Sequence, residues 1–296
     1  MTTTLAAARQ RRRAATARRP RFGLAVRRYG LRWLVGLVVS GIILVPLAYA
    51  VFGGFKTNGE LVGGVGLVPR QWVLTNYGEL LVAPHFWRQV GNSVLVALVT
   101  VGLGVSCAAL AAFAFARMRF RGREFFYTLF TLGLLFPIAV AILPLFVLLR
   151  TLGLIGNPLG VALPQAAFAL PLSIVILRPF FRSIPGELED AARVDGCSAF
   201  GFFVRVVLPL SRPALATVSV LTLVSSWNAF LLPLLVFQGA EQWTLPLGVM
   251  NFSTEHTSDW ARILAYTSLS MVPAVLFYAV AERQIVSGLT AGSVKA

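Results

Sequence analysis

Residues Ser93–Ala116 have the sequence SVLVALVTVGLGVSCAALAAFAFA, which contains no Asp, Glu, Lys or Arg. A helix crosses the hydrocarbon of a bilayer with about 20 residues, so this stretch is long enough to span a membrane once. It lacks the alternation of hydrophobic and polar residues that is typical of a membrane β-strand. Since backbone groups in lipid must bond to one another, the stretch predicts a transmembrane helix.

Similar charge-free apolar stretches recur along the chain, and the composition agrees with them. Hydrophobic residues make up 57% of the sequence and charged residues only 12%, whereas soluble domains carry about 25% charged residues. The sequence therefore predicts an all-α, polytopic membrane protein with six transmembrane helices. Their expected ranges are Trp33–Phe55, Ser93–Ala116, Phe125–Leu149, Val161–Leu177, Ala214–Phe237 and Ile263–Ala281.

The basic residues predict the orientation of these helices. The net charge of +15 comes from 26 Lys+Arg against 11 Asp+Glu, and arginines recur through residues 1–30, ahead of the first acidic residue, Glu60. We expect residues 1–30 to form a disordered cytoplasmic tail and both termini to be cytoplasmic, because basic residues collect on that side of a membrane. Only five basic residues fall on the other side: Lys56, Arg70, Arg88, Arg150 and Arg262.

The arginine-rich start has other interpretations. Nucleic-acid binding is disfavoured, because no aromatic residues are interleaved with the arginines. A cleaved signal peptide remains an alternative, since Ala48-Tyr49-Ala50 resembles a cleavage site, and so does a mitochondrial transit peptide. The apolar run continues to Phe55, which is long for a signal peptide.

Several kinds of chemistry lack the residues they need. Every charged residue lies in a loop, in a tail or at the end of a predicted span, which argues against a proton relay and against an ion-coupled carrier. The two histidines, His85 and His256, form no metal-binding pair, and we predict no metal site. Neither lysine, Lys56 nor Lys295, follows a glycine as a phosphate-binding loop requires, so we expect no bound cofactor. An ion-coupled secondary carrier and a membrane-embedded enzyme remain the alternative functions.

The loop between the fourth and fifth predicted spans has the sequence RSIPGELEDAARVDGCSAFGFFVRVVLPLSRP, from Arg182 to Pro213. Ser183 and Pro185 predict the start of a helix, Gly196 predicts its end, and Ser198 predicts the cap of a second short helix. This helix–turn–helix could lie on the lipid surface as an amphipathic element. Its cluster of acidic residues would be repelled by an anionic leaflet, which favours docking of a cytoplasmic partner.

Asp190-Ala191-Ala192, followed by Gly196 and by Val206-x-Leu208-Pro209, resembles the EAA loop of permease subunits in bacterial ATP-binding-cassette importers. Asp190 replaces the usual Glu, and Val206 the usual Ile. The resemblance implies a MetI-like permease domain over residues 31–296, with a transporter core at about 88–285 and the EAA-type loop at 182–213. It also implies that the loop forms a coupling helix seated in a cleft of an ATPase subunit. The implied coupling residues are Glu187, Glu189, Asp190, Ala191, Ala192, Asp195, Gly196 and Pro209.

Other fragments are similar to the smaller permease of maltose-type systems, and they occur in the order expected for it. The resemblance implies a permease subunit of an ATP-driven sugar importer in the bacterial cytoplasmic membrane. The implied partners are a second permease subunit, two copies of a cytoplasmic ATPase that uses ATP and Mg, an extracytoplasmic sugar-binding protein and membrane lipid, but no nucleic acid. The chain itself would not be an enzyme. The fragments are Leu74–Tyr77, Asn92-Ser93, Ala111–Arg117, Trp227-Asn228 with Leu232–Leu234, and Gly288–Lys295.

Uncharged polar residues in the last two predicted spans are candidates for lining a sugar path. Hydroxyl, amide and aromatic groups can bind a neutral polyol, although Ser and Thr in membranes also bond between helices. The segments Lys56–Gly91 and Gln238–Trp260 are candidates for contact with the binding protein. The candidate path-lining residues are Ser225, Ser226, Asn228, Tyr266, Thr267, Ser268 and Ser270.

Overall fold

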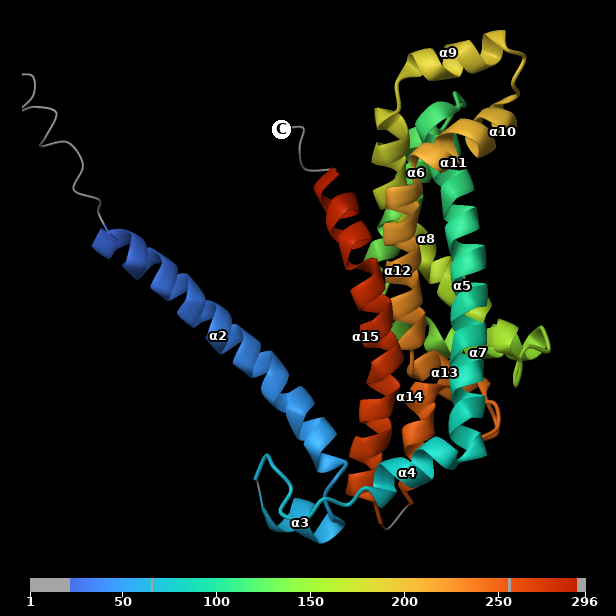
Figure 1. Cartoon of the computed structure of the whole chain (residues 1–296). Coiled ribbons are helices and arrows are strands. Elements are labelled where there is room, and N and C mark those ends of the chain that lie inside the picture. Colours follow the sequence, from blue (N-terminus) through green and yellow to red (C-terminus); the bar gives the residue numbers. More distant parts are fainter. Residues whose placement is uncertain (1–21, 65, 255–256, 292–296) are drawn as a thin grey trace, which may run out of the picture. The chain divides into compact units, whose positions relative to one another are not determined.

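The computed structural model describes residues 22–64, 66–254 and 257–291. The described residues are helical or irregular, apart from one isolated antiparallel bridge between Ser253 and Ser258. The protein is thus all-helical (Figure 1). Its elements are α2 (Phe22–Gly53), α3 (Asn58–Gly63), α4 (Thr75–Val82), α5 (Pro84–Arg117), α6 (Arg123–Leu132), η1 (Gly133–Leu135), α7 (Ile138–Thr151), α8 (Pro158–Ser183), α9 (Gly186–Val194), α10 (Ala199–Phe202), η2 (Phe203–Val207), α11 (Leu208–Leu210), α12 (Arg212–Trp227), α13 (Leu231–Val236), α14 (Leu245–Gly248), η3 (Val249–Phe252) and α15 (Trp260–Ala291).

The chain divides into two compact units, Met1–Tyr49 and Ala50–Ala296. Of the tail predicted over residues 1–30, residues 1–21 lie outside the described part, and α2 begins at Phe22. Pro46 lies inside α2 without ending it. The helical bundle, the loop after α8 and the pocket described below belong to the second unit.

Four helices are individually long and apolar enough to cross a bilayer, among the residues that the structure describes. Two further pairs of helices pass the same test together but are sharply bent, so the number of spans rises to six if each pair counts as one. The six-helix prediction agrees with this upper number. The four long helices include the segments Arg32–Gly53, Pro84–Arg117, Pro158–Ser183 and Trp260–Ala279.

The third and fifth predicted spans are not continuous helices. The third consists of α6 with η1 and then α7, bent by 102°. Pro137 stands at this bend and Phe136 before it is extended, because proline disfavours the helical conformation of the preceding residue. The predicted span Ala214–Phe237 divides into α12, which ends at Trp227, and the short α13. At its other end α12 meets the segment Ala199–Leu210 at 80°.

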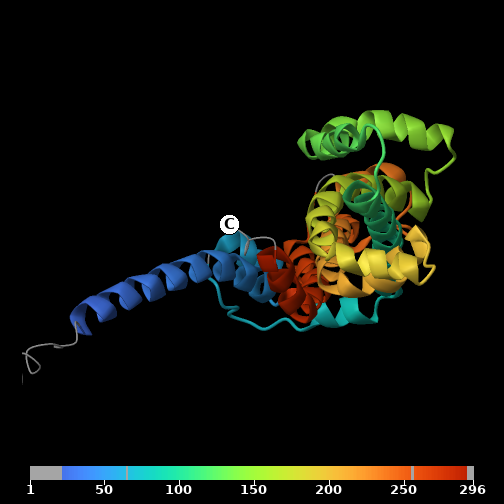
Figure 2. The ribbon, with the colours of Figure 1, turned by 90° about the horizontal axis from the view of Figure 1, so that it is seen from above.

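Helices α5 and α8 form the centre of the second unit, and they pack against each other more extensively than any other pair of described elements. Small residues permit this close approach. A Cβ added at Gly104 of α5 would lie 3.4 Å from the Cα of Ala166 on α8, and Ala108 and Ala112 of α5 are fully buried. Helix α12 packs against both of them and α15 packs against α12, so that these four helices form a bundle (Figure 1), while α7 lies outside it in the view from above (Figure 2).

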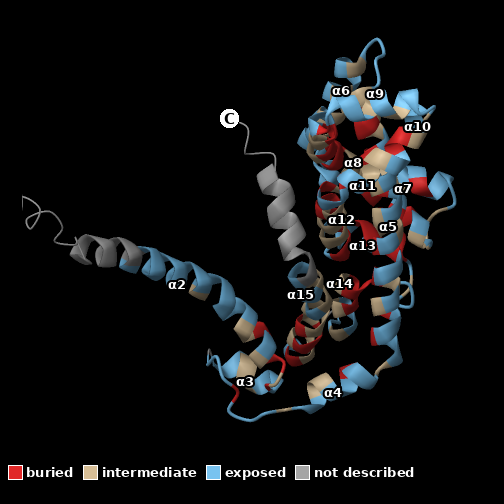
Figure 3. Cartoon of the chain, turned by 45° about the horizontal axis from the view of Figure 1, so that its top comes forward, coloured by how far each residue is buried: buried red, intermediate tan, exposed pale blue. Residues whose placement is uncertain are grey.

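The buried residues lie mainly within this bundle, and its outer surface is exposed (Figure 3). Many of the exposed side chains are large and apolar, such as Leu98, Leu143 and Val275. Exposed apolar surface on this scale is unfavourable in water and suits contact with lipid. The bundle therefore has the surface expected of a membrane protein.

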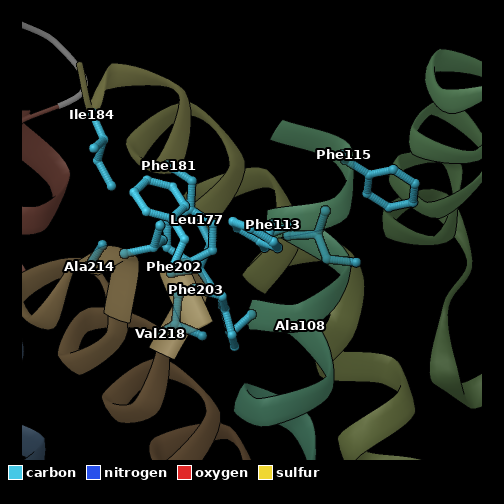
Figure 4. Close-up of a cluster of buried hydrophobic side chains, with 14 residues drawn as sticks. Ala108, Phe113, Phe115, Leu177, Phe181, Ile184, Phe202, Phe203, Ala214 and Val218 are labelled. Atoms are coloured by element: carbon cyan, nitrogen blue, oxygen red, sulfur yellow. The ribbon is translucent and has the colours of Figure 1, made fainter. Parts of the chain in front are cut away.

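One end of the bundle carries α9, α10 and α11, and the opposite end carries α3 and α4 (Figure 1). A cluster of buried apolar residues supports the first of these ends (Figure 4). In it Phe202 and Phe203, from α10 and η2, pack with Phe113 of α5. Phe181 of α8 belongs to the same cluster and is fully buried. The loop that follows α8 therefore packs against the ends of α5, α8 and α12.

Candidate functional site

The loop at residues 182–213 folds as the predicted helix–turn–helix. Helix α9 starts after Pro185, with Glu187 and Glu189 in its first turn, where carboxylates complement the helix dipole. Gly196 ends it with a φ of +76°, a conformation that favours glycine. The Ser198 Oγ then caps α10 by accepting a hydrogen bond from the Gly201 N–H at 3.1 Å. The predicted start of the first helix near Pro185, its end at Gly196 and the cap of the second helix at Ser198 are confirmed.

The predicted coupling residues do not all face the same way. Most are exposed on α9 or on the turn after it, and Ala191 is among them. Ala192 is partly buried and packs against the apolar cluster at the end of the bundle. The Glu189 side chain is only 19% exposed, and its carboxylate lies 2.6 Å from the Arg193 guanidinium and 3.6 Å from that of Arg117. The exposed members are Glu187, Asp190, Ala191, Asp195, Gly196 and Pro209.

A pocket of about 470 Å³ lies between α8 and α12. This volume falls within the range of about 300–1,000 Å³ that is usual for small-molecule sites. Its walls are largely apolar, with the rings of Phe168 and Phe230 among them. None of the residues that line it, all from the described part of the chain, is Asp, Glu, Lys or Arg. A pocket of this kind suits a neutral ligand.

Three polar side chains form a hydrogen-bonded group in this pocket. The Ser226 Oγ donates to the Gln165 Oε1 at 2.6 Å, and the Thr100 Oγ1 donates to the same oxygen at 3.2 Å. The Gln165 side chain has no partner for its Nε2 within the described residues, although the residue is only 9% exposed. Turning the amide over would leave its oxygen unpartnered instead. An unpaired buried amide costs about 1–3 kcal/mol, so Gln165 has hydrogen-bonding capacity that the chain does not satisfy.

The structure brings together only some of the residues predicted to line a path. Ser225, Ser226 and Asn228 all line the pocket, whereas the four candidates on α15 do not. On α15 the Tyr266 hydroxyl donates to the Gln89 Oε1 at 2.6 Å. The other three hydroxyls bond to carbonyls one turn back in their own helix, with distances of 2.7 Å for Thr267, 2.7 Å for Ser268 and 2.8 Å for Ser270.

Gln165 and Thr100 are not among the path-lining residues predicted from the sequence. Both are single polar residues inside apolar helices, and neither belongs to a motif. Gln165 lies between Pro164 and Ala166 in the predicted fourth span, and a lone buried amide in such a span was a usable signal. Nothing in the described ranges gathers three or more His, Cys, Asp or Glu side chains into a possible metal site.

Comparison with known proteins shows the family of the chain and agrees with its helical fold. Residues 100–285 match the family model of the binding-protein-dependent transport system inner membrane component. The arabinooligosaccharides transport system permease protein AraQ of Halalkalibacterium halodurans is 33% identical over 272 residues, which cover 90% of this chain and 97% of that relative. The trehalose transport system permease protein SugB of Mycobacterium tuberculosis is 33% identical over 260 residues, covering 87% and 94%.

A solved structure shares the same fold. It belongs to a bacterial ABC transporter involved in the import of the acidic polysaccharide alginate. The TM-score is 0.75 over 88% of this chain and 97% of that one, with 23% sequence identity.

Proposed function

The chain belongs to the family of binding-protein-dependent transport system inner membrane components, and from this membership we propose that it is the permease subunit of an ATP-driven importer of neutral sugars. The observation that carries the sugar assignment is the pocket between α8 and α12. It combines apolar and aromatic walls with uncharged hydroxyl and amide groups, which is the chemistry that holds a neutral polyol in place. The transport systems named for the two relatives above support the same class of substrate.

The importer would contain a second permease subunit, two ATPase subunits that bind ATP and Mg, and an extracytoplasmic sugar-binding protein. A multi-pass permease of this family lies in the inner membrane. We place both termini and the α9–α11 end of the bundle in the cytoplasm, because the basic residues collect on that side. The segments 56–91 and 238–260 then face the binding protein.

In this arrangement α9 would couple ATP hydrolysis to transport. Its exposed face carries small Ala191 and exposed carboxylates, so a partner surface can approach closely. Closure of the ATPase subunits would displace α9, and the bundle would alternate between outward-facing and inward-facing states. Such coupling requires that α9 make different contacts in the two states.

We expect sugar import to depend on ATP. The complete complex, assembled from this chain with its second permease, ATPase and binding protein, is reconstituted into vesicles. The probes are radiolabelled maltose, trehalose and diacetylchitobiose. The binding protein loaded with at least one of them should stimulate ATP hydrolysis, and the same sugar should accumulate only when ATP is present. Accumulation driven by an ion gradient without ATP would contradict the proposal in favour of a secondary carrier.

The two cysteines allow a test of orientation. Cys197 lies in the turn after α9 and is partly exposed, while Cys107 lies within α5. In a Cys107→Ser variant, we expect a membrane-impermeant maleimide to label Cys197 in inside-out membrane vesicles but not in intact cells. A Cys197→Ser variant of the same protein is the control for background labelling. Labelling of Cys197 in intact cells would place the loop on the outer side and would contradict the cytoplasmic docking role.

A further inference from the structure

Arg117, the last residue of α5, binds the end of the neighbouring helix α8. Its Nε donates to the Phe181 carbonyl at 3.0 Å, and its Nη2 donates to the carbonyl of Ile184. The last carbonyls of a helix lack partners within it and carry partial negative charge. Arg117 therefore caps α8 from outside, with a side chain that is only 11% exposed.

The same guanidinium reaches the coupling helix. Its Nη1 lies 3.6 Å from the Glu189 Oε2, so one arginine contacts both the end of α8 and the first turn of α9. Both side chains are largely withdrawn from water, and an ion pair in such a position is screened less by salt than an exposed pair. The Glu189 side chain therefore points toward the bundle and away from the exposed side of α9.

A second arginine makes the reciprocal connection. Arg178 of α8 donates from its Nε to the Phe115 carbonyl of α5 at 3.2 Å. Its Nη2 lies 2.5 Å from the Glu124 carboxylate of α6, and its guanidinium stacks 3.7 Å above the Tyr127 ring. Each arginine thus binds the other's helix and a carboxylate on a third element. Together they join the ends of α5, α6, α8 and α9.

We propose that Arg117 and Glu189 form the joint through which displacement of α9 moves α5 and α8 as a pair. Glu189 is then a positioning residue of this chain and not a contact to the ATPase. The inference rests on the proposed function, because it takes α9 as the element that the ATPase moves. Without the joint, α9 is held to α8 by the chain at Ile184–Pro185 and by the packing of Ala192. The planar guanidinium fork fixes the angle between the two helices, which a flexible connection does not.

The test measures how much sugar is transported per ATP hydrolysed. Glu189→Gln removes the charge that holds α9 and leaves the bonds from Arg117 to the α8 carbonyls. Arg117→Gln removes both the ion pair with Glu189 and the bonds from the guanidinium to the α8 carbonyls. The complete complex is reconstituted with whichever of maltose, trehalose or diacetylchitobiose the wild type accumulates fastest. We expect each variant to lower the sugar transported per ATP roughly three- to tenfold, while ATP hydrolysis continues. The double variant should be no worse than Arg117→Gln alone, and Arg117→Lys should restore part of the loss.

The matched control is Arg182→Gln. Arg182 lies at the same end of α8 and pairs with Glu124 at 3.3 Å, but its side chain is 47% exposed and no contact joins it to α9 in the described structure. The sugar transported per ATP should be unchanged in this variant. If Arg117→Gln fails to fold, Glu189→Gln still tests the joint, because it leaves the cap on α8 intact.

Three results would overturn the joint. One is an unchanged amount of sugar per ATP in Glu189→Gln. Another is a double variant whose loss of sugar per ATP equals the product of the two single losses. That result would mean that Arg117 and Glu189 act independently and do not share one interaction. The third is weaker co-purification of the ATPase with Glu189→Gln, which would make Glu189 a docking contact. Failure of the wild-type complex to import any of the three sugars with ATP would instead overturn the proposed function, and the joint with it.

Discussion

Replacing Ala191 with arginine is expected to lower ATP-driven sugar uptake roughly a hundredfold, equivalent to about 2.8 kcal/mol of lost interaction with the ATPase. Ala191 is exposed on α9, so a longer side chain there meets the docking partner and disturbs little within the chain. The amount of protein in the membrane should stay normal. Ala192→Arg is a less specific test, because Ala192 packs against the apolar cluster and its replacement also damages the fold.

The measurements for Ala191→Arg are uptake by reconstituted complexes and co-purification of the ATPase. Ala191→Ser keeps a small side chain and should retain uptake close to that of the wild type. Wild-type uptake by Ala191→Arg, with an equal amount of bound ATPase, would mean that the ATPase does not approach this face of α9.

Gln165→Leu is expected to lower kcat/KM for uptake roughly 10- to 100-fold, equivalent to about 1.4–2.8 kcal/mol. Leucine is similar in size but cannot bond to a sugar hydroxyl, and it also leaves the Ser226 and Thr100 hydroxyls without their shared acceptor. ATP hydrolysis in the absence of sugar should be unchanged, because Gln165 lies in the bundle and α9 lies beyond its end. The measurement is the initial rate of uptake over a range of concentrations of sugar-loaded binding protein.

Gln89→Leu is the matched control for this variant. Gln89 is fully buried and, like Gln165, has an Nε2 without a partner in the described structure, but it lies in α5 outside the pocket. Its loss should reduce the stability of the complex, since it removes the bond to Tyr266. Although Gln89 falls within segment 56–91, its side chain is fully buried and does not reach the binding protein, so KM should be unchanged. If the two variants reduced uptake to the same extent, with no change in KM, the pocket would have no direct role in binding sugar.

The transmembrane helices were predictable because their signal is long and strong. A run such as Ser93–Ala116 has few alternatives to a spanning helix. The end of α9 and the start of α10 were also predictable, since Gly196 and Ser198 act through their own backbone and nearest neighbours. The bend at Pro137 was not. Pro144, Pro164 and Pro171 lie within continuous helices, so a proline alone does not say whether its helix will continue or break.

The pocket was only partly predictable, for a different reason. Ser225 and Ser226 line it, but Ser268 and Ser270 of α15 satisfy their hydroxyls within their own helix. Composition cannot distinguish these two cases, because the difference depends on how each helix is rotated in the bundle. The lone amide of Gln165 was visible in the sequence, but its grouping with Thr100 and Ser226 depends on how α5 and α12 pack against α8.

The contact between Gly104 and Ala166 has a consequence for how substrate preference can change. Gln165 is the immediate neighbour of Ala166, so the backbone that presents its amide is held by the close packing of α5 against α8. Few substitutions are therefore tolerated on the α8 wall of the pocket, around Gln165. The facing wall includes Leu221, Ser225 and residues 228–232, several of them exposed and not bound into the α5–α8 contact. If the pocket binds sugar as proposed, new specificities are therefore most accessible through substitutions on this second wall, which can accumulate while the first wall keeps the Gln165 amide in place.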